Sequence, residues 1–353
     1  MTRLDWSAHP LVLAPMAGGP STVALAAATA AGGVFPFLAG AYLAPERLRD
    51  DVAALRAETT KPFGVNVFAP SPNPPSAAAD VVAYAEQLAP WAAAAGVALG
   101  EARWDDDSFE AKVDVLVEAA PPVVSFSFAW PPAEVVTRLQ RAGVEVWVTI
   151  NEPEEAAWAV ELGVDGLVAQ GWEAGGHRGG PVDTGTEQLP LLELVRAVLA
   201  RTDLPVMGAG GVMTGADAAM VLDAGADAVA LGTAFLDCPE AGTAPVHRYA
   251  LTHHTDRHHE VDTVVTRAFS GRSARALTTT WTELFTGAAP AAYPHVHHLT
   301  APLRAHGKAT GEAELVHLWA GTGHAALRAL PAEQLARTLL EELAAARAVG
   351  AGD

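Results

Sequence analysis

Eight short apolar runs, separated by stretches of helical length, constrain the fold of this chain more than any other feature. The runs begin at Leu11, Val34, Phe63, Val123, Glu145, Gly166, Pro205 and Ala228. Most of them are continuously apolar and do not alternate, as expected for parallel strands covered on both faces. Stretches rich in Ala, Leu and Glu lie between them, for example 154–162, 191–201 and 216–224. This alternation predicts repeated βα units and a parallel sheet.

A recurring glycine marks the ends of the helical stretches. It occurs in Gly32-Gly33 and again at Gly96, Gly143, Gly163 and Gly225. Glycine suits the left-handed residue that ends a helix before the chain turns into a strand. Eight strands within about 235 residues predict a TIM (β/α)₈ barrel. A doubly wound open sheet is the alternative, but no Gly-x-Gly-x-x-Gly follows the first strand.

Two segments interrupt the βα rhythm. Residues 70–122 predict a helical insertion after the third strand, and residues 237–327, rich in His, Thr and Arg, predict a helical excursion beside the barrel mouth. A last helix at 331–349, opened by Pro331, is a plausible closing helix. We therefore expect residues 1–236 and 331–349 to form the barrel, and 237–327 to form a mainly helical lid.

The stretch from Leu11 to Pro45 carries no Asp, Glu, Lys or Arg, which superficially resembles a membrane span. Gly18-Gly19-Pro20, Gly32-Gly33 and Pro36 break it into shorter pieces. Asp5 and His9 precede it, which is unfavourable for a signal peptide. We therefore interpret it as a buried strand–helix–strand unit and expect no membrane association.

The charge balance and the cysteine count restrict the partners. The chain has 353 residues, with 22 Lys and Arg against 41 Asp and Glu, a net charge of −19. Such a charge repels phosphate backbones, so nucleic acid is not an expected partner. The single cysteine, Cys238, excludes an intrachain disulfide and fits a reducing cytoplasm. We expect a cytoplasmic monomer or homodimer.

Glycines follow both of the last two predicted strands. Gly210-Gly211 follows the seventh strand, and Gly232-Thr233 follows the eighth. In this kind of barrel, the two loops and the helix starts behind them form a phosphate site, with backbone N–H groups as donors. Thr214 and Asp217 also fit a capping box for the helix after the seventh strand. A ligand with a terminal phosphate, such as FMN, fits this arrangement.

The loop Gln170–Gly180 directly follows the sixth run and contains five glycines and His177. Glycines at this density let the backbone approach a ligand closely. His177 is therefore placed where a bound molecule could touch it. An imidazole near neutrality can remove an α-proton from a carbon acid, or as imidazolium can bind an anion.

Five segments together resemble the nitronate monooxygenase family. They are residues 14–19, 63–68, 170–179, 205–211 and 230–236. The most specific one reads Glu-Ala-Gly-Gly-His-Arg-Gly from Glu173 to Gly179. The resemblance implies an FMN-dependent barrel enzyme that oxidises alkyl nitronates, or nitroalkanes, with O₂ to a carbonyl compound and nitrite.

The resemblance also implies roles for individual residues. Pro15 and Met16 would lie against the flavin, and His177 would face the substrate as base or orienting group. The remaining expected FMN contacts are Asn66, Gln170, Gly175, Gly210, Gly211, Ala230, Leu231, Gly232 and Thr233. Arg178 is interpreted as a loop-bracing or rim cation rather than a catalyst, and Glu173 as a residue that braces the loop or His177. The segment 318–323 resembles a family segment in which Gln often stands in place of Thr322.

Two other functions remain open at this point. One is an NAD(P)H-dependent FMN reductase on the same barrel, either a quinone reductase or an enoyl-acyl-carrier-protein reductase. The other is a flavin-binding protein without turnover. His253, His254, His258 and His259 include i,i+4 pairs of the kind metal sites use. They lie away from the strand ends and lack a His-Glu-x-x-His motif, so we expect no metal.

Overall fold

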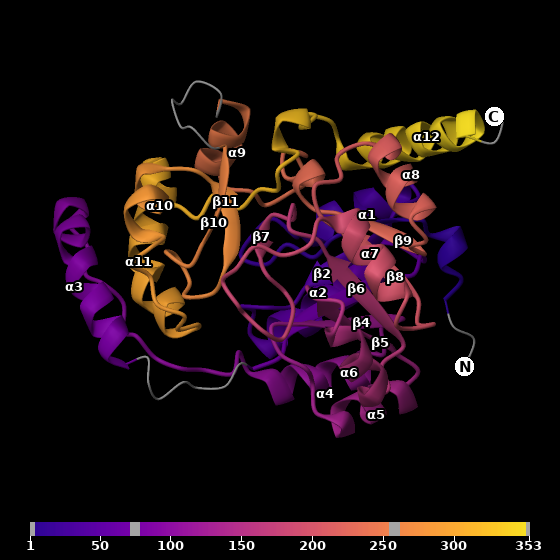
Figure 1. The fold of residues 1–353 in the computed structure, drawn as a ribbon, viewed down its shortest axis with the longest axis horizontal. Helices are drawn as coiled ribbons and strands as arrows, with labels where there is room; N and C mark the ends of the chain where they lie inside the picture. The colour runs from indigo at the N-terminus through magenta and orange to yellow at the C-terminus, as the bar shows by residue number, and fades with distance from the viewer. Residues whose placement is uncertain (1–3, 71–77, 254–261, 351–353) are drawn as a thin grey trace.

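A closed barrel of eight parallel strands forms the body of the computed structural model, which describes residues 4–70, 78–253 and 262–350 (Figure 1). The strands are β1 (Leu11–Leu13), β2 (Phe35–Ala39), β3 (Gly64–Phe68), β4 (Val123–Ser127), β5 (Glu145–Ile150), β6 (Gly166–Gln170), β8 (Val206–Ala209) and β9 (Ala228–Leu231). β9 pairs with β1, with Val12 opposite Ala230, and this pairing closes the barrel. All eight predicted runs form strands, so the predicted TIM barrel is confirmed.

Helices surround the barrel and end as the glycine pattern predicts. They are α1 (Val23–Ala31), α2 (Pro45–Glu58), α4 (Phe109–Ala119), α5 (Ala133–Arg141), α6 (Glu155–Leu162), α7 (Leu191–Leu199) and α8 (Gly215–Asp223). The glycines with positive φ include Gly33, Gly143, Gly163 and Gly225, each just after one of these helices. The predicted closing helix, α12 (Ala332–Gly350), packs against α1 and α8 and completes the ring.

Large aromatic rings fill the barrel at the amino ends of its strands. Trp6, from the short 3-10 helix η1 (Trp6–Ala8), lies 4.9 Å from Trp147 and 5.1 Å from Phe35, measured between ring centroids. Gly166 makes room for this cluster, because a Cβ there would lie 2.4 Å from the Trp147 ring. At the opposite end of the strands, small residues such as Ala209 leave the barrel mouth open for a ligand.

The segment after β9 contains strands as well as the predicted helices. Its helices are α9 (Pro245–Thr252), α10 (Thr280–Phe285) and α11 (His295–Thr310). Between α9 and α10, β10 (Thr263–Thr266) and β11 (Ala274–Leu277) form an antiparallel hairpin, and β7 (Gly176–His177) adds a third strand. The hairpin strands, Thr-Val-Val-Thr and Ala-Arg-Ala-Leu, lack the continuous apolar pattern that marks the barrel strands, and β7 comes from a loop almost 100 residues earlier in the chain.

The insertion after β3 is divided between two parts of the molecule. α4 packs beside α2 and α5 on the barrel, whereas α3 (Ala78–Ala95) packs against α11. Tyr84 and Leu88 of α3 share a hydrophobic core with Trp281 and Leu299, and α3, α10 and α11 lie together beside the barrel in Figure 1. The Tyr84 hydroxyl also donates to the backbone oxygen of Ala268 at 2.7 Å. The domain boundaries remain a prediction, but this packing places α3 with the segment after β9.

The charge-free stretch near the start of the chain forms β1, α1 and β2, as predicted. Within residues 4–70, 78–253 and 262–350, no helix is long and apolar enough to cross a membrane.

Candidate active site

A cavity of about 510 Å³ opens at the carboxyl ends of the barrel strands. This volume lies within the range of about 300–1,000 Å³ that small-molecule sites occupy. Its lining includes His177 and most of the expected FMN contacts, namely Pro15, Met16, Asn66, Gln170, Gly175, Gly210, Gly211, Ala230, Gly232 and Thr233. Leu231 is the exception among the predicted residues, because its side chain is 1% exposed within the core. The Leu231 carbonyl accepts a hydrogen bond from the backbone of Ala14 at 3.0 Å.

The two glycine loops meet at one end of this cavity. Gly210 and Gly211 both have positive φ, and α8 begins four residues after Gly211 with the predicted Thr214–Asp217 capping box. The hydroxyl of Thr233 accepts a hydrogen bond from the backbone N–H of Gly321 at 3.0 Å. Gly321 also lines the cavity, so the segment 318–323 reaches the cavity beside Thr233.

Two amide side chains line the middle of the cavity in different ways. The Asn66 nitrogen donates to the hydroxyl of Ser125 at 2.9 Å, and its oxygen has no hydrogen-bond partner in the described chain. Asn66 therefore offers a free acceptor near the strand ends. The Gln170 amide is used inside its own loop, because it donates to the His177 carbonyl at 3.0 Å and accepts from Gly179 at 2.8 Å.

Buried arginines hold the carbonyl groups of the Gln170–Gly180 loop. Arg178 donates to the carbonyls of Gln170 at 2.7 Å and Gly171 at 2.9 Å, which matches the bracing role expected from the sequence. Arg275, from β11, donates twice to the Trp172 carbonyl, at 2.7 and 3.0 Å. Arg272 donates to the Arg178 carbonyl at 2.8 Å. Sequence reasoning missed Arg272 and Arg275, since nothing in the sequence places the hairpin against the loop.

Glu173 has a structural contact of its own. Its carboxylate accepts a hydrogen bond at 3.0 Å from the backbone N–H of Leu191, the first residue of α7. The side chain thus binds an N–H at the start of a helix, where negative charge is favourable. This contact fits a bracing role rather than a chemical one.

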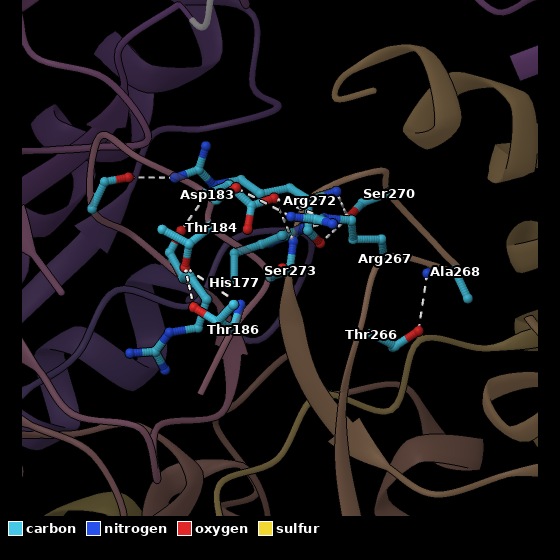
Figure 2. Close-up of polar contacts among 12 residues, drawn as sticks. His177, Asp183, Thr184, Thr186, Thr266, Arg267, Ala268, Ser270, Arg272 and Ser273 are labelled. Atoms are coloured by element: carbon cyan, nitrogen blue, oxygen red, sulfur yellow. Dashed lines mark hydrogen bonds and ion pairs between the residues drawn. The ribbon is translucent and has the colours of Figure 1, made fainter. Parts of the chain in front are cut away.

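The His177 ring lies on the cavity wall among aromatic side chains. Its centroid is 5.2 Å from the rings of Phe128 and Trp319. Its Nε2 atom lies 2.8 Å from the hydroxyl of Ser270, a residue that the sequence did not single out (Figure 2). Burial and the nearby charges of Arg272 and Arg304 lower the pKa of His177 to about 3. The ring is therefore neutral near pH 7 and offers a lone pair rather than a positive charge.

The cavity wall is positively charged although the whole chain is strongly negative. Arg304 and Lys308 of α11 line it, and none of the described lining residues is Asp or Glu. Their i,i+4 spacing places both on one face of the helix. Burial lowers the pKa of Arg304 to about 10, which leaves it protonated at neutral pH. The site therefore favours an anionic ligand.

The other reactive groups do not form a site in the described chain. No group of three His, Cys, Asp or Glu in residues 4–70, 78–253 and 262–350 is arranged to hold a metal ion. His254, His258 and His259 lie outside those residues, so the predicted cluster is not described. Cys238 is buried, and burial raises the pKa of its thiol to about 12. A thiol in this state is protonated and unreactive.

The barrel and its cavity define an enzyme of the TIM-barrel class, with its ligand site at the carboxyl ends of the strands. A sequence model described as nitronate monooxygenase matches residues 3–342. A protein named nitronate monooxygenase from Pseudomonas aeruginosa is 39% identical over 352 residues, covering 97% of this chain and 98% of the relative. The chain therefore belongs to the nitronate monooxygenase family, and it is an oxidoreductase.

One solved structure agrees with this assignment, and a second shares the fold. The crystal structure of a nitroalkane oxidase from Streptomyces ansochromogenes has a TM-score of 0.91 and 44% identity, with 97% of each chain covered. FabK from Thermotoga maritima has a TM-score of 0.75 and 24% identity, covering 98% of this chain and 96% of that one. The second likeness shows a shared fold alone.

Proposed function

We propose that this protein uses FMN to oxidise alkyl nitronates, and the nitroalkanes from which they form, with O₂ to a carbonyl compound and nitrite. The observation that carries the proposal is a single cavity in which His177 lies on a positively charged wall. A nitronate is an anion, and so is the phosphate of FMN. Both suit a cavity that includes Arg304 and Lys308 and no carboxylate among its described lining residues.

The cavity residues fit a flavin that carries a phosphate. The backbone N–H groups of Gly211 and Gly232-Thr233 would bind the phosphate, since both loops border the same end of the cavity. Pro15 and Met16 would lie against the isoalloxazine ring, and the unpartnered oxygen of Asn66 would accept a hydrogen bond from it. When bound, the flavin supplies the electron acceptor for the oxidation.

His177 would act as an uncharged hydrogen-bond acceptor and base. Its pKa is lowered to about 3, so the ring is already neutral at pH 7, although the same shift makes it a weaker base than a free imidazole. The proton taken up would be balanced by the nitronate charge formed in the same step. For a substrate that arrives already as a nitronate, no proton has to be removed, and Arg304 and Lys308 on the cavity wall would favour the anion.

The proposal is tested by the variant His177→Asn, with His253→Asn as a matched control at an exposed position on the C-terminal side of α9. We expect His177→Asn to retain flavin and to lose at least about 100-fold in nitrite release from nitroalkanes, the usual contribution of a general base. His253→Asn should behave like the wild type. Reduction of the flavin by NAD(P)H, with no nitrite formed from nitronates under air, would contradict the proposal and favour the reductase alternative.

A further inference from the structure

The His177 ring is held at one of its two nitrogen atoms. Nε2 lies 2.8 Å from the Ser270 hydroxyl, whereas Nδ1 has no hydrogen-bond partner in the part of the chain that the structure describes. Nδ1 is also not fully enclosed by protein atoms. Since His177 lines the cavity and its Nε2 is engaged by Ser270, the unpartnered Nδ1 is the ring nitrogen left for a ligand. The tautomer of His177 therefore decides whether a lone pair or an N–H meets the substrate.

The surroundings of Ser270 select between the two tautomers. Its hydroxyl is 3.1 Å from the carbonyl oxygen of Arg272 and 3.3 Å from the Arg272 backbone N–H. A hydroxyl has one proton to donate. If it donates to the Arg272 carbonyl, its oxygen accepts from His177 Nε2–H and from the Arg272 N–H, and all three contacts are satisfied. If it donates to Nε2 instead, the contact with the Arg272 carbonyl is lost.

We propose that Ser270 is the positioning residue that holds His177 as the Nε2–H tautomer, so that the Nδ1 lone pair points at the substrate. This inference rests on the proposed function and deepens it, because a lone pair serves a substrate that has a proton to give. In a neutral nitroalkane, the Cα–H bond breaks and the proton bonds to Nδ1. The electron pair forms the C=N bond and the negative charge goes to the nitro oxygens, giving the nitronate and imidazolium.

Several contacts fix Ser270 in place. It lies in the turn between β10 and β11, where Gly271 has a φ of +80° and a Cβ would lie 2.6 Å from the Ala292 backbone. On one side, the ring of Phe269 is stacked on Trp281 in the hydrophobic core shared by α3, α10 and α11, with 5.6 Å between the ring centroids. This packing holds the side of the turn that precedes Ser270.

An ion pair anchors the other side of the same turn (Figure 2). Arg267 Nε donates to the carboxylate of Asp183 at 3.0 Å, and the backbone N–H of Ser273 donates to the same oxygen at 3.1 Å. Burial of Asp183 opposes its ionisation, but the bonds from Arg267 and Ser273 outweigh this and lower its pKa. The hairpin also pairs with the histidine backbone, because Ala274 of β11 lies opposite His177 of β7. Backbone and ring of His177 are therefore held by one preorganised hairpin.

The test compares Ser270→Ala with Ser273→Ala in the flavin-loaded enzyme. Both serines are buried in the same hairpin, but Ser273 does not line the cavity and its contact with Asp183 is through the backbone. Initial rates are measured with a neutral nitroalkane and with the nitronate prepared from it in alkali. We expect Ser270→Ala to lower kcat/KM for the nitroalkane by about 10-fold or more, because a base is mispositioned, while nitronate oxidation is nearly unchanged. Ser273→Ala should leave both rates unchanged.

The tautomer itself is read by ¹⁵N chemical shifts of histidine-labelled enzyme, with the His177 signals assigned by their loss in His177→Asn. The wild type is expected to show a protonated Nε2 and an unprotonated Nδ1, and Ser270→Ala to shift the population toward Nδ1–H. If Ser270→Ala does not fold, Ser270→Cys replaces it, since a thiol keeps the volume but bonds weakly. The same shift and the same loss are expected in that variant.

A wild-type His177 with Nδ1 protonated would overturn the inference. An unchanged ratio of nitroalkane to nitronate rates in Ser270→Ala would also overturn it. If neither compound is turned over by the wild type but the ¹⁵N shifts respond to Ser270 as expected, the proposed function fails while the assignment of Ser270 is supported.

Discussion

Buried neutral histidines make the stability of this protein fall in mild acid, and His247 gives the sharpest test. Its side chain is 7% exposed on the cavity wall, and its Nε2 atom has no hydrogen-bond partner among the residues that the structure describes. Burial is the main cause that lowers its pKa to about 4, with further contributions from the charges of Lys308 and Arg248. In an unfolded chain, histidine titrates near pH 6.5. The replacement His247→Gln removes this titration from both states.

The magnitude follows from the difference between the two pKa values. Between pH 6.5 and about 4, the unfolded state holds a proton on His247 that the folded state does not. Stability contributed by the neutral His247 is therefore complete above pH 6.5 and is lost as the pH falls toward 4. Each pH unit corresponds to about 1.4 kcal/mol, so acidification from pH 7.5 to 4.5 costs the wild type about 2 to 3 kcal/mol through this one side chain.

Urea unfolding followed by far-ultraviolet circular dichroism, at several pH values from 7.5 to 4.5, measures this loss. Loss of the His247 side chain also changes the free energy of unfolding by an amount that does not depend on pH. Subtracting the difference between the two proteins at pH 7.5 removes this amount. After this subtraction, the wild type should have lost about 2 to 3 kcal/mol more stability than His247→Gln at pH 4.5. The exposed control His253→Gln should follow the wild type. Parallel curves for wild type and His247→Gln would refute the reasoning.

Two glycine replacements give further predictions. Gly166→Ala places a Cβ 2.4 Å from the Trp147 ring and should cost about 1–3 kcal/mol in urea unfolding, as overpacking does, whereas Gly287→Ala meets nothing within 4 Å and should be nearly neutral. Equal stabilities of these two variants would contradict the packing described for the barrel. Gly211→Ala requires a φ of +70° and a Cβ 2.9 Å from Glu173, so FMN affinity in a fluorescence titration should fall by about 10-fold or more. Unchanged affinity would remove Gly211 from the phosphate site.

The barrel could be predicted because its signals are local. Most barrel strands are continuous apolar runs, and glycines such as Gly163 and Gly225 end the helices with the positive φ that their positions require. The Thr214–Asp217 capping box is likewise a pattern within four residues. The loop with His177 could be found for the same reason, since its glycines are adjacent in the sequence.

The surroundings of His177 could not be predicted because they depend on contacts between distant segments. Ser270 lies 93 residues after His177, and its position depends on a hairpin whose strands have only four residues each. Arg275 and Arg304 resemble ordinary charged residues in the sequence, and their roles appear only when β11 and α11 pack on the barrel mouth. The side chain of Leu231, an expected cofactor contact, lies in the core because alternate residues of a strand point to opposite faces, which leaves only its backbone for such a contact.

The central claim, that this cavity binds a flavin and uses it to oxidise nitronates, is tested most directly by anaerobic spectroscopy of the purified protein. A visible spectrum with flavin bands is recorded first, and an alkyl nitronate or NAD(P)H is then added without O₂. We expect the nitronate to bleach the flavin bands, NAD(P)H to leave them unchanged, and readmission of O₂ to restore them with release of nitrite. A protein that takes up no FMN, or whose flavin is bleached by NAD(P)H and not by nitronate, would contradict the account.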